Sequence, residues 1–302
     1  MKLTILGSSS AAPTLTRHHT SQYLEIANKT FLVDCGEAAQ IQLRKYRCKI
    51  SKISRIFISH LHGDHYFGLI GLISSMHLYN NIEELHIHGP AGLDEIIRLQ
   101  LKYSQSFLKF KLFFHATNPD QHDILYEDDN IVVSSFPLLH RVPCTGFLFK
   151  EKPKYRRLIK DKIPDDITLE QIATLKKGGD IIVDGNVKYS NIDYTRDAPK
   201  SHSYAYCSDT IFRPEISEYF KGVELLYHEA TFDNEFANRA AKTFHSTAAQ
   251  AAKIATLANA ENLIIGHFSA RYKELDTLLV ESKQEFERVM LAEEGKTYLF
   301  QD

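Results

Sequence analysis

Short apolar runs separated by turn residues characterise both ends of the chain. In the first part, four such runs predict β-strands, and helical periodicity follows them at residues 37–47 and 67–79. In the last hundred residues, three more runs predict strands that alternate with helical patterns near 246–259 and 275–292. The predicted strands are 2–6, 22–27, 30–36, 55–60, 204–210, 224–230 and 262–268. The pattern predicts an α/β (α+β) fold made of two similar halves.

Between the halves, residues 150–200 turn polar and contain the breakers "KIPDD", "KKGGD" and "VDGN". We expect this segment to be an arm inserted in a single domain that spans residues 1–302. The stretch "KEKPKYRRLIKDK" at 150–162 carries seven basic and two acidic residues. By itself such a run is more typical of a solvated loop than of a binding surface.

Composition is that of an ordinary globular protein, with 43% apolar and 25% charged residues in 302. It excludes disorder, and no apolar run is long enough to span a membrane. The first ten residues are too polar for a signal peptide, so a cytoplasmic location is expected. The four cysteines form no CxxC pair and are expected to be free thiols.

Four apolar runs end in a side chain that can bind a metal. These are His60 after "RIFIS", His140 after "SFPLL", Asp209 after "YAYCS" and His267 after "LIIG". Strand ends that meet at one edge of a sheet form a natural site. A lone histidine at a strand end is usually structural, so none of these residues alone indicates a metal site.

The segment "HLHGDH" at 60–65 places His60, His62, Asp64 and His65 within six positions. So many imidazoles beside a carboxylate would repel one another or stay unsatisfied without a cation. Imidazole suits zinc, and a carboxylate can bridge two ions. The segment therefore predicts a site for two metal ions. His86 and His88 also alternate along a predicted strand, but we interpret them as its outer face.

Seven blocks in order carry a family resemblance: "LGSSSAAPTLTRHHTSQYLE", "FLVDCGEAAQIQL", "ISHLHGDHYFGLIGLISSM", "CSDT", "YHEATF", "FHST" and "IIGHFSARY". Together they resemble the signature blocks of the ribonuclease Z family, tRNA 3′-processing endonucleases of the metallo-β-lactamase superfamily. The resemblance implies an αββα metallo-β-lactamase sandwich with a two-zinc site at its edge. It also implies a homodimer in which one subunit's arm helps hold the precursor tRNA engaged by the other.

The resemblance also implies roles for individual residues. One zinc would be held by His60, His62 and His140, the other by Asp64, His65 and His267, with Asp209 between them. Asp64 would orient or deprotonate the attacking water, His245 would protonate the leaving oxygen, and Glu229 would hold His245. Asp34 would support the ligands. Phosphates would meet the basic residues Lys154, Arg156, Arg157 and Arg271.

The implied activity is zinc-dependent removal of the 3′ trailer from precursor tRNA, which leaves a 3′-OH on the tRNA. The arm departs from the family pattern, because bacterial members usually carry a Gly/Pro-rich tip that this chain lacks. Two alternatives remain open from the residues. One is a metallo-β-lactamase-fold hydrolase of small phosphodiesters or thioesters, and the other is a non-catalytic RNA-binding relative.

Overall fold

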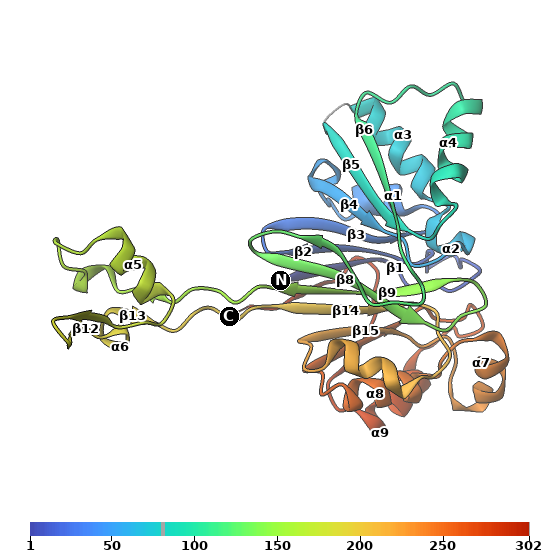
Figure 1. The fold of residues 1–302 in the computed structure, drawn as a ribbon. Coiled ribbons are helices and arrows are strands. Elements are labelled where there is room, and N and C mark those ends of the chain that lie inside the picture. The colour runs from blue at the N-terminus through green and yellow to red at the C-terminus, as the bar shows by residue number, and fades with distance from the viewer. Residues whose placement is uncertain (80–81, 302) are drawn as a thin grey trace. The chain divides into compact units, whose positions relative to one another are not determined.

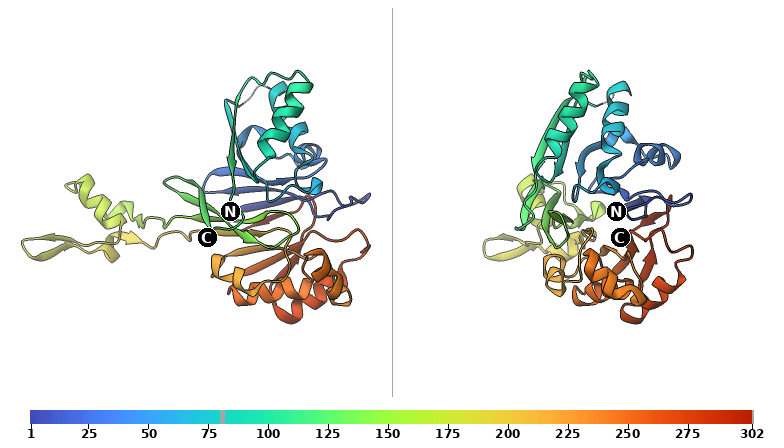
Figure 2. Two further views of the ribbon diagram at one scale, coloured as in Figure 1. Left: turned by 45° about the vertical axis from the view of Figure 1, so that its right-hand side comes forward. Right: turned by 90° about the vertical axis from the view of Figure 1, so that its right-hand side faces the viewer.

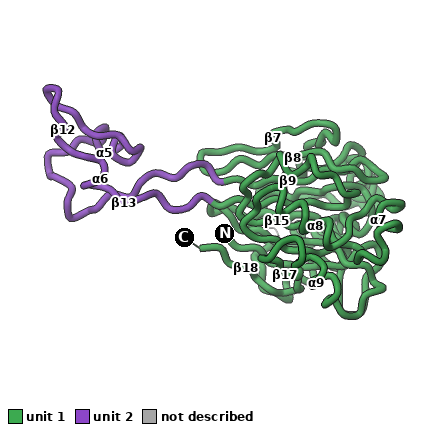
Figure 3. Tube along the Cα trace, turned by 90° about the horizontal axis from the view of Figure 1, so that it is seen from below, with its two compact units in different colours: residues 1–150, 202–301 green, residues 151–201, 302 purple. Residues whose placement is uncertain are grey.

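The computed structural model describes residues 1–79 and 82–301. The described chain divides into two compact units, which Figure 3 colours separately. The larger unit contains Met1–Lys150 and His202–Gln301, and the smaller contains Glu151–Ser201.

Two sheets form the centre of the larger unit, and each has seven strands within the described residues (Figure 1). The first sheet runs in the order β18 (Thr297–Leu299), β1 (Lys2–Gly7), β2 (Ser21–Ile26), β3 (Lys29–Cys35), β4 (Ile53–Phe57), β5 (Glu84–Gly89) and β6 (Lys111–Ala116). The second runs β17 (Val289–Leu291), β16 (Asn262–Gly266), β15 (Leu225–Glu229), β14 (Ser203–Cys207), β9 (Cys144–Glu151), β8 (Ile131–Leu138) and β7 (Asp123–Glu127).

Helices cover the outer face of each sheet, as Figures 1 and 2 show. On the first sheet, Leu43, Leu72 and Ile97 from three of its helices pack against strand residues in one buried cluster. Ile254 and Leu278 anchor helices of the second sheet. The helices of the larger unit are α1 (Ala39–Lys45), α2 (Gly63–Tyr66), α3 (Leu69–Tyr79), α4 (Leu93–Tyr103), α7 (Ala237–Thr243), α8 (Ala248–Leu257) and α9 (Asp276–Glu285), with 3₁₀ turns at Ile50–Lys52, Pro214–Phe220 and Asn234–Phe236. The predicted αββα sandwich is confirmed.

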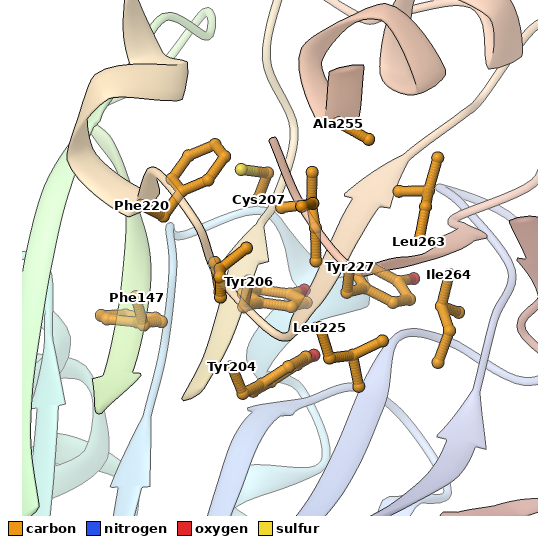
Figure 4. Packing of buried hydrophobic residues seen from close by; sticks show 14 of the residues in the cluster. Phe147, Tyr204, Tyr206, Cys207, Phe220, Leu225, Tyr227, Ala255, Leu263 and Ile264 are labelled. Carbon is orange, nitrogen blue, oxygen red and sulfur yellow. The ribbon is translucent and has the colours of Figure 1, made fainter. Parts of the chain in front are cut away.

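Aromatic side chains fill the space between the sheets. Phe57 of β4 packs edge-on against Phe149 of β9, with ring centroids 5.2 Å apart. Figure 4 shows the same core around Tyr204, Tyr206 and Tyr227, which are fully buried. The Tyr206 hydroxyl donates a hydrogen bond of 2.5 Å to Asp34 Oδ2, so the core is linked to a polar group at the sheet edge.

Most local predictions are confirmed, with ends shifted by a few residues. All seven predicted strands exist, and the helix near 246–259 is α8, which begins with a capping box formed by Thr247 and Gln250. The helix predicted over 275–292 is wrong in its second half. It ends at Glu285, and Val289–Leu291 instead forms β17, which pairs in parallel with β16. All four cysteines are free, as expected.

The smaller unit has a core of its own. Leu175, Ile181 and Tyr189 are buried together, and helix α5 starts with a capping box at Thr168. Its elements are β10 (Arg157–Leu158), a 3₁₀ turn at Lys160–Lys162, α5 (Leu169–Lys176), β11 (Ile181–Val183), β12 (Asn186–Tyr189), α6 (Asn191–Tyr194) and β13 (Thr195–Arg196). Among the described residues of either unit, no helix is long and apolar enough to cross a membrane.

Candidate functional site

The ends of four strands supply the side chains of one site in the larger unit. His60 follows β4, His140 follows β8, Asp209 follows β14 and His267 follows β16, each within three residues of the strand end. Both sheets therefore contribute. A cavity of about 490 Å³ opens at this place, and its walls are Ala11, His19, Glu37, His62, Gly63, Asp64, Phe67, His140, Arg141, Asp209, Thr243, His245 and His267.

Three imidazoles and a carboxylate form the first group of possible ligands. His62 Nδ1 lies 3.1 Å from both His60 Nε2 and His140 Nε2. Asp209 Oδ2 lies 3.7 Å from the same two Nε2 atoms. One ligand atom from each of the four residues thus faces a common centre.

A second group lies beside the first. His65 Nε2 and His267 Nε2 are 3.2 Å apart, and Asp64 Oδ2 is 3.4 and 3.3 Å from them. The other oxygen of Asp209, Oδ1, lies 3.5 Å from His65 Nε2 and 3.2 Å from His267 Nε2. The two oxygens of one carboxylate therefore face different groups.

The chemistry of these groups fits metal cations. Burial lowers the pKa of His60, His62 and His140, so their rings are neutral and the facing nitrogen lone pairs are available. Asp209 is buried, which alone would raise its pKa, but nearby imidazoles hold that pKa well below its usual range. Its Oδ1 is buried with no hydrogen-bond partner in the described chain. Neutral imidazoles around a carboxylate are a typical donor set for a borderline divalent ion.

Hydrogen bonds behind the ligand groups fix the orientation of the rings. Asp34 accepts bonds from Ser59 N at 2.8 Å, Ser59 Oγ at 2.9 Å and His65 Nδ1 at 2.7 Å. His140 Nδ1 lies 2.9 Å from the Phe244 carbonyl and donates to it. Because these Nδ1 atoms carry the proton, the Nε2 atoms of His65 and His140 are left to bind a cation. Asp34 thus contacts the cluster through His65, on the side away from the facing Nε2 atoms.

Glu229 and His245 form a pair at the edge of the cavity. Glu229 is fully buried at the end of β15 and accepts hydrogen bonds from Thr231 N, Thr231 Oγ1 and Ser246 N at 2.7–2.9 Å. His245 Nδ1 lies 3.1 Å from Glu229 Oε1 and 3.9 Å from Asp209 Oδ2. Burial works against the charged ring, but the two carboxylates outweigh it and raise the pKa of His245 to about 9.

The predicted phosphate-binding residues lie elsewhere. Arg271 is not in the cavity wall; its guanidinium stacks 4.1 Å from the Phe236 ring centroid, and its Nε donates to Ser269 Oγ. Lys154, Arg156 and Arg157 belong to the smaller unit. There they line a shallow depression together with Tyr155, Leu158, Lys160, Lys176 and Pro199.

Sequence reasoning missed several groups that support the site. Ser59 Oγ lies 3.0 Å from His60 Nδ1, and Thr231 Oγ1 lies 3.0 Å from His267 Nδ1. The backbone N–H of Ala11 donates to Asp64 Oδ2 at 2.8 Å. Ser59 and Thr231 stand close to motif residues in the sequence, which is a weak signal of a supporting role. The Ala11 contact joins positions 53 residues apart, so no local sequence signal indicates it.

Known proteins that resemble this chain fall into two sets. Proteins named Ribonuclease Z match almost all of it. The protein from Cytophaga hutchinsonii is 49% identical over 302 residues, which cover 100% of this chain and 96% of the relative. The protein from Bacteroides fragilis strain YCH46 is 46% identical over 295 residues, which cover 97% of each chain. A family model described as "Anti-Pycsar protein Apyc1" matches residues 1–174.

Solved structures also resemble the chain over nearly its full length. The short form of human tRNase Z superposes with a TM-score of 0.73 at 28% identity, covering 99% of each chain. A metallo-beta-lactamase fold protein from Bacillus subtilis superposes with a TM-score of 0.68 at 19% identity, covering 98% of each chain, and supports the fold alone.

The Glu229–His245 pair yields a prediction about pH. We expect Glu229→Gln to lower the pKa of His245 from about 9 towards the ordinary value of about 6.5, because the main charge that favours the imidazolium is removed. The pKa is read from the ring signals of His245 by NMR in chelator-treated protein. Because the folded-state pKa of His245 is raised, the Glu229–His245 pair adds to the free energy of unfolding below about pH 6.5. This contribution is lost as the pH rises through about 9. Glu235→Gln, at an exposed carboxylate, is the control. An unchanged His245 pKa in Glu229→Gln would refute the assignment.

Proposed function

This chain belongs to the ribonuclease Z family, and on that premise we propose how its strand-end cluster cleaves precursor tRNA. It is a metal-dependent endoribonuclease that processes the 3′ end of tRNA. The observation that carries this function is the pair of ligand groups that share Asp209, in a chain 46–49% identical to ribonucleases Z over nearly their full length. Over residues 1–174 the chain belongs also to the family of the Apyc1 model.

The metal site is proposed to hold two zinc ions. His60, His62 and His140 would bind one ion and Asp64, His65 and His267 the other, with one oxygen of Asp209 on each. The facing nitrogen atoms and the split carboxylate support this assignment. When bound, two such cations polarise a phosphodiester and supply a nucleophile at neutral pH.

Two residues are proposed to move protons in the reaction. Asp64, held by the Ala11 N–H, orients the attacking water and accepts its proton. The water oxygen bonds to phosphorus as the bond from phosphorus to the 3′ oxygen breaks. His245 gives its proton to that 3′ oxygen, so the tRNA leaves with a 3′-OH and the trailer keeps the phosphate. The Glu229 carboxylate supports this role because it keeps the His245 ring protonated and oriented.

The smaller unit, Glu151–Ser201, is proposed to be the arm that the sequence predicts over residues 150–200 and to bind the tRNA body. Lys154, Arg156, Arg157, Lys160 and Lys176 line one depression there, and Tyr155 lies among them. A concentration of cations with an aromatic ring suits a sugar–phosphate backbone. A hydrolase of small diesters or thioesters would not need this surface, so it supports the tRNA substrate over that alternative. Arg271 is exposed and remains a proposed further phosphate contact.

We also propose that the enzyme is a homodimer. Helices α3 and α4 and the loop after α4 lie on the outer face of the first sheet (Figure 1). They carry five large apolar side chains that are exposed in the single chain: Leu78, Tyr79, Leu99, Tyr103 and Phe107. Exposed apolar patches of this kind mark interfaces between proteins. A second copy of the chain is the proposed occupant. A cytoplasmic location, where precursor tRNA is met, belongs to the same proposal.

The function is tested on a precursor tRNA with a 3′ trailer, with both product ends mapped. We expect the native protein to release a tRNA ending in 3′-OH and a trailer with a 5′ phosphate. His245→Ala should lower turnover by roughly 10²–10⁴, the usual contribution of a general acid, at unchanged metal content. No cleavage by the native protein would refute the function, and loss of metal in His245→Ala would refute the proton-donor role.

The metal site is tested by elemental analysis after full loading. We expect about two zinc ions per native chain, because the ligand set exceeds what one tetrahedral site uses. Asp209→Ala should cause the largest loss of activity among single ligand variants, since it removes a ligand from both ions and the negative charge between them. Asp120→Ala, at an exposed turn, serves as the control. One equivalent or less in the native protein would contradict the two-ion site.

The arm is tested by replacing residues 153–199 with a short Gly/Ser linker. Cleavage of a small chromogenic phosphodiester should survive, because the segment contains no proposed metal ligand. Affinity for precursor tRNA should fall, and its dependence on salt should become shallower, because fewer counterions are released on binding. The double variant Arg157→Glu/Lys160→Glu should reproduce the effect, whereas Lys188→Glu, outside the depression, should not. If the deletion lowered tRNA cleavage and hydrolysis of the small phosphodiester equally, the arm assignment would be wrong.

A further inference from the structure

Arg141 occupies a position in the catalytic cavity that no role described so far explains. It follows His140 directly, its side chain is exposed, and it lies in the cavity wall. Among the described residues of that wall, it is the only lysine or arginine. We propose that Arg141 binds the backbone phosphate next to the scissile one and so aligns the RNA across the metal centre. This inference rests on the proposed function, because it needs a polynucleotide substrate.

The charges around the cavity make such a group necessary. The wall carries the carboxylates of Glu37, Asp64 and Asp209. Two cations would balance the ligand carboxylates and the scissile phosphate, but an RNA strand brings further phosphates on both sides of that bond. Without Arg141 a neighbouring phosphate would meet no lysine or arginine in the described wall, and Glu37 would repel it. The other cationic group there, the His245 ring, is assigned to the leaving oxygen.

The guanidinium of Arg141 is not held by other protein groups among the described residues, whereas two other arginines make contacts of their own. Arg17 donates to the carbonyls of Tyr272, at 2.6 Å, and Ser269. Arg271 stacks on Phe236 and donates to Ser269 Oγ. Arg141 makes no hydrogen bond or ion pair within the described chain. Its planar fork of N–H donors therefore remains available for the two oxygens of a phosphate.

The backbone that carries Arg141 is nevertheless held in place. On one side, the Leu139 N–H donates to Thr210 Oγ1 at 3.2 Å, and the Leu139 carbonyl accepts from Ile211 N at 3.0 Å. On the other side, Thr145 N donates to the Ser59 carbonyl at 3.1 Å. A free side chain on a fixed turn loses little backbone freedom when its ligand binds.

The experiment compares native protein, Arg141→Ala and Arg141→Lys on a precursor tRNA and on a small chromogenic phosphodiester. We expect Arg141→Ala to lower kcat/KM for the tRNA roughly 10- to 100-fold, because a charge-assisted hydrogen bond usually contributes this much. Most of the change should appear as a higher KM. Arg141→Lys should recover part of the loss, because it keeps the charge without the fork. The small diester has no neighbouring phosphate, so its kcat/KM should stay within about twofold of native.

A chemical change in the substrate identifies the contact itself. A neutral methylphosphonate is placed at the phosphate on the 5′ side of the cleavage site in one substrate and on the 3′ side in another. With the methylphosphonate at one of these positions, the native enzyme and Arg141→Ala should have the same kcat/KM. The contact between Arg141 and the phosphate charge is then missing in both cases. Arg98→Ala, at an exposed arginine of α4 paired with Asp94, is the matched control and should behave as native.

The outcomes separate the two proposals. If the native protein does not cleave precursor tRNA, the proposed function fails. If it does and Arg141→Ala cleaves the tRNA as well as native, or if neither methylphosphonate removes the difference, the inference about Arg141 is wrong. Parallel loss of metal content and of both activities would also overturn it, since Arg141 would then act through its neighbour His140.

Discussion

Charge balance in a buried space is the constraint on which the rest of this structure depends. Imidazole nitrogens from distant parts of the chain face one another at 3.1–3.2 Å around the two oxygens of Asp209. Removed from water, such a set is stable only if each ring has a defined proton and the lone pairs find a cation. Asp34, Thr231 and the Phe244 carbonyl meet the first condition. A bound divalent cation would meet the second.

The fold meets this constraint with strand ends and with a few unusual backbone conformations. Asp34, Phe244 and His267 all have left-handed backbones, with φ of 53°, 60° and 59°. Asp and His adopt this conformation more often than most residues, but for a bulky Phe it is costly. Phe244 ends α7 in that conformation, and its carbonyl then reaches His140. Local strain is thus placed where it orients a proposed ligand.

The sequence predicted the parts of the molecule that depend on local pattern. Strand positions, the capping box at Thr247 and the family blocks around residues 60–65 could all be read from short stretches. What it missed depends on tertiary pairing. β17 forms because β16 offers a parallel partner, although its residues continue a helical pattern. His88, interpreted as part of the outer face of a strand, is buried because Phe57 stacks on it, with centroids 4.8 Å apart.

The distance along the chain between the two halves of the site has a consequence for synthesis. His65 and His267 touch across 202 positions, and β16, which positions His267, pairs only with strands from the last third of the chain. A growing chain on the ribosome carries His60, His62 and His65 and strands β1–β6 of the first sheet long before β18, β16 and His267 have been made. The nuclease centre is therefore completed only after residue 267 has been made, and shorter nascent fragments carry the first histidine cluster without the groups that complete the site.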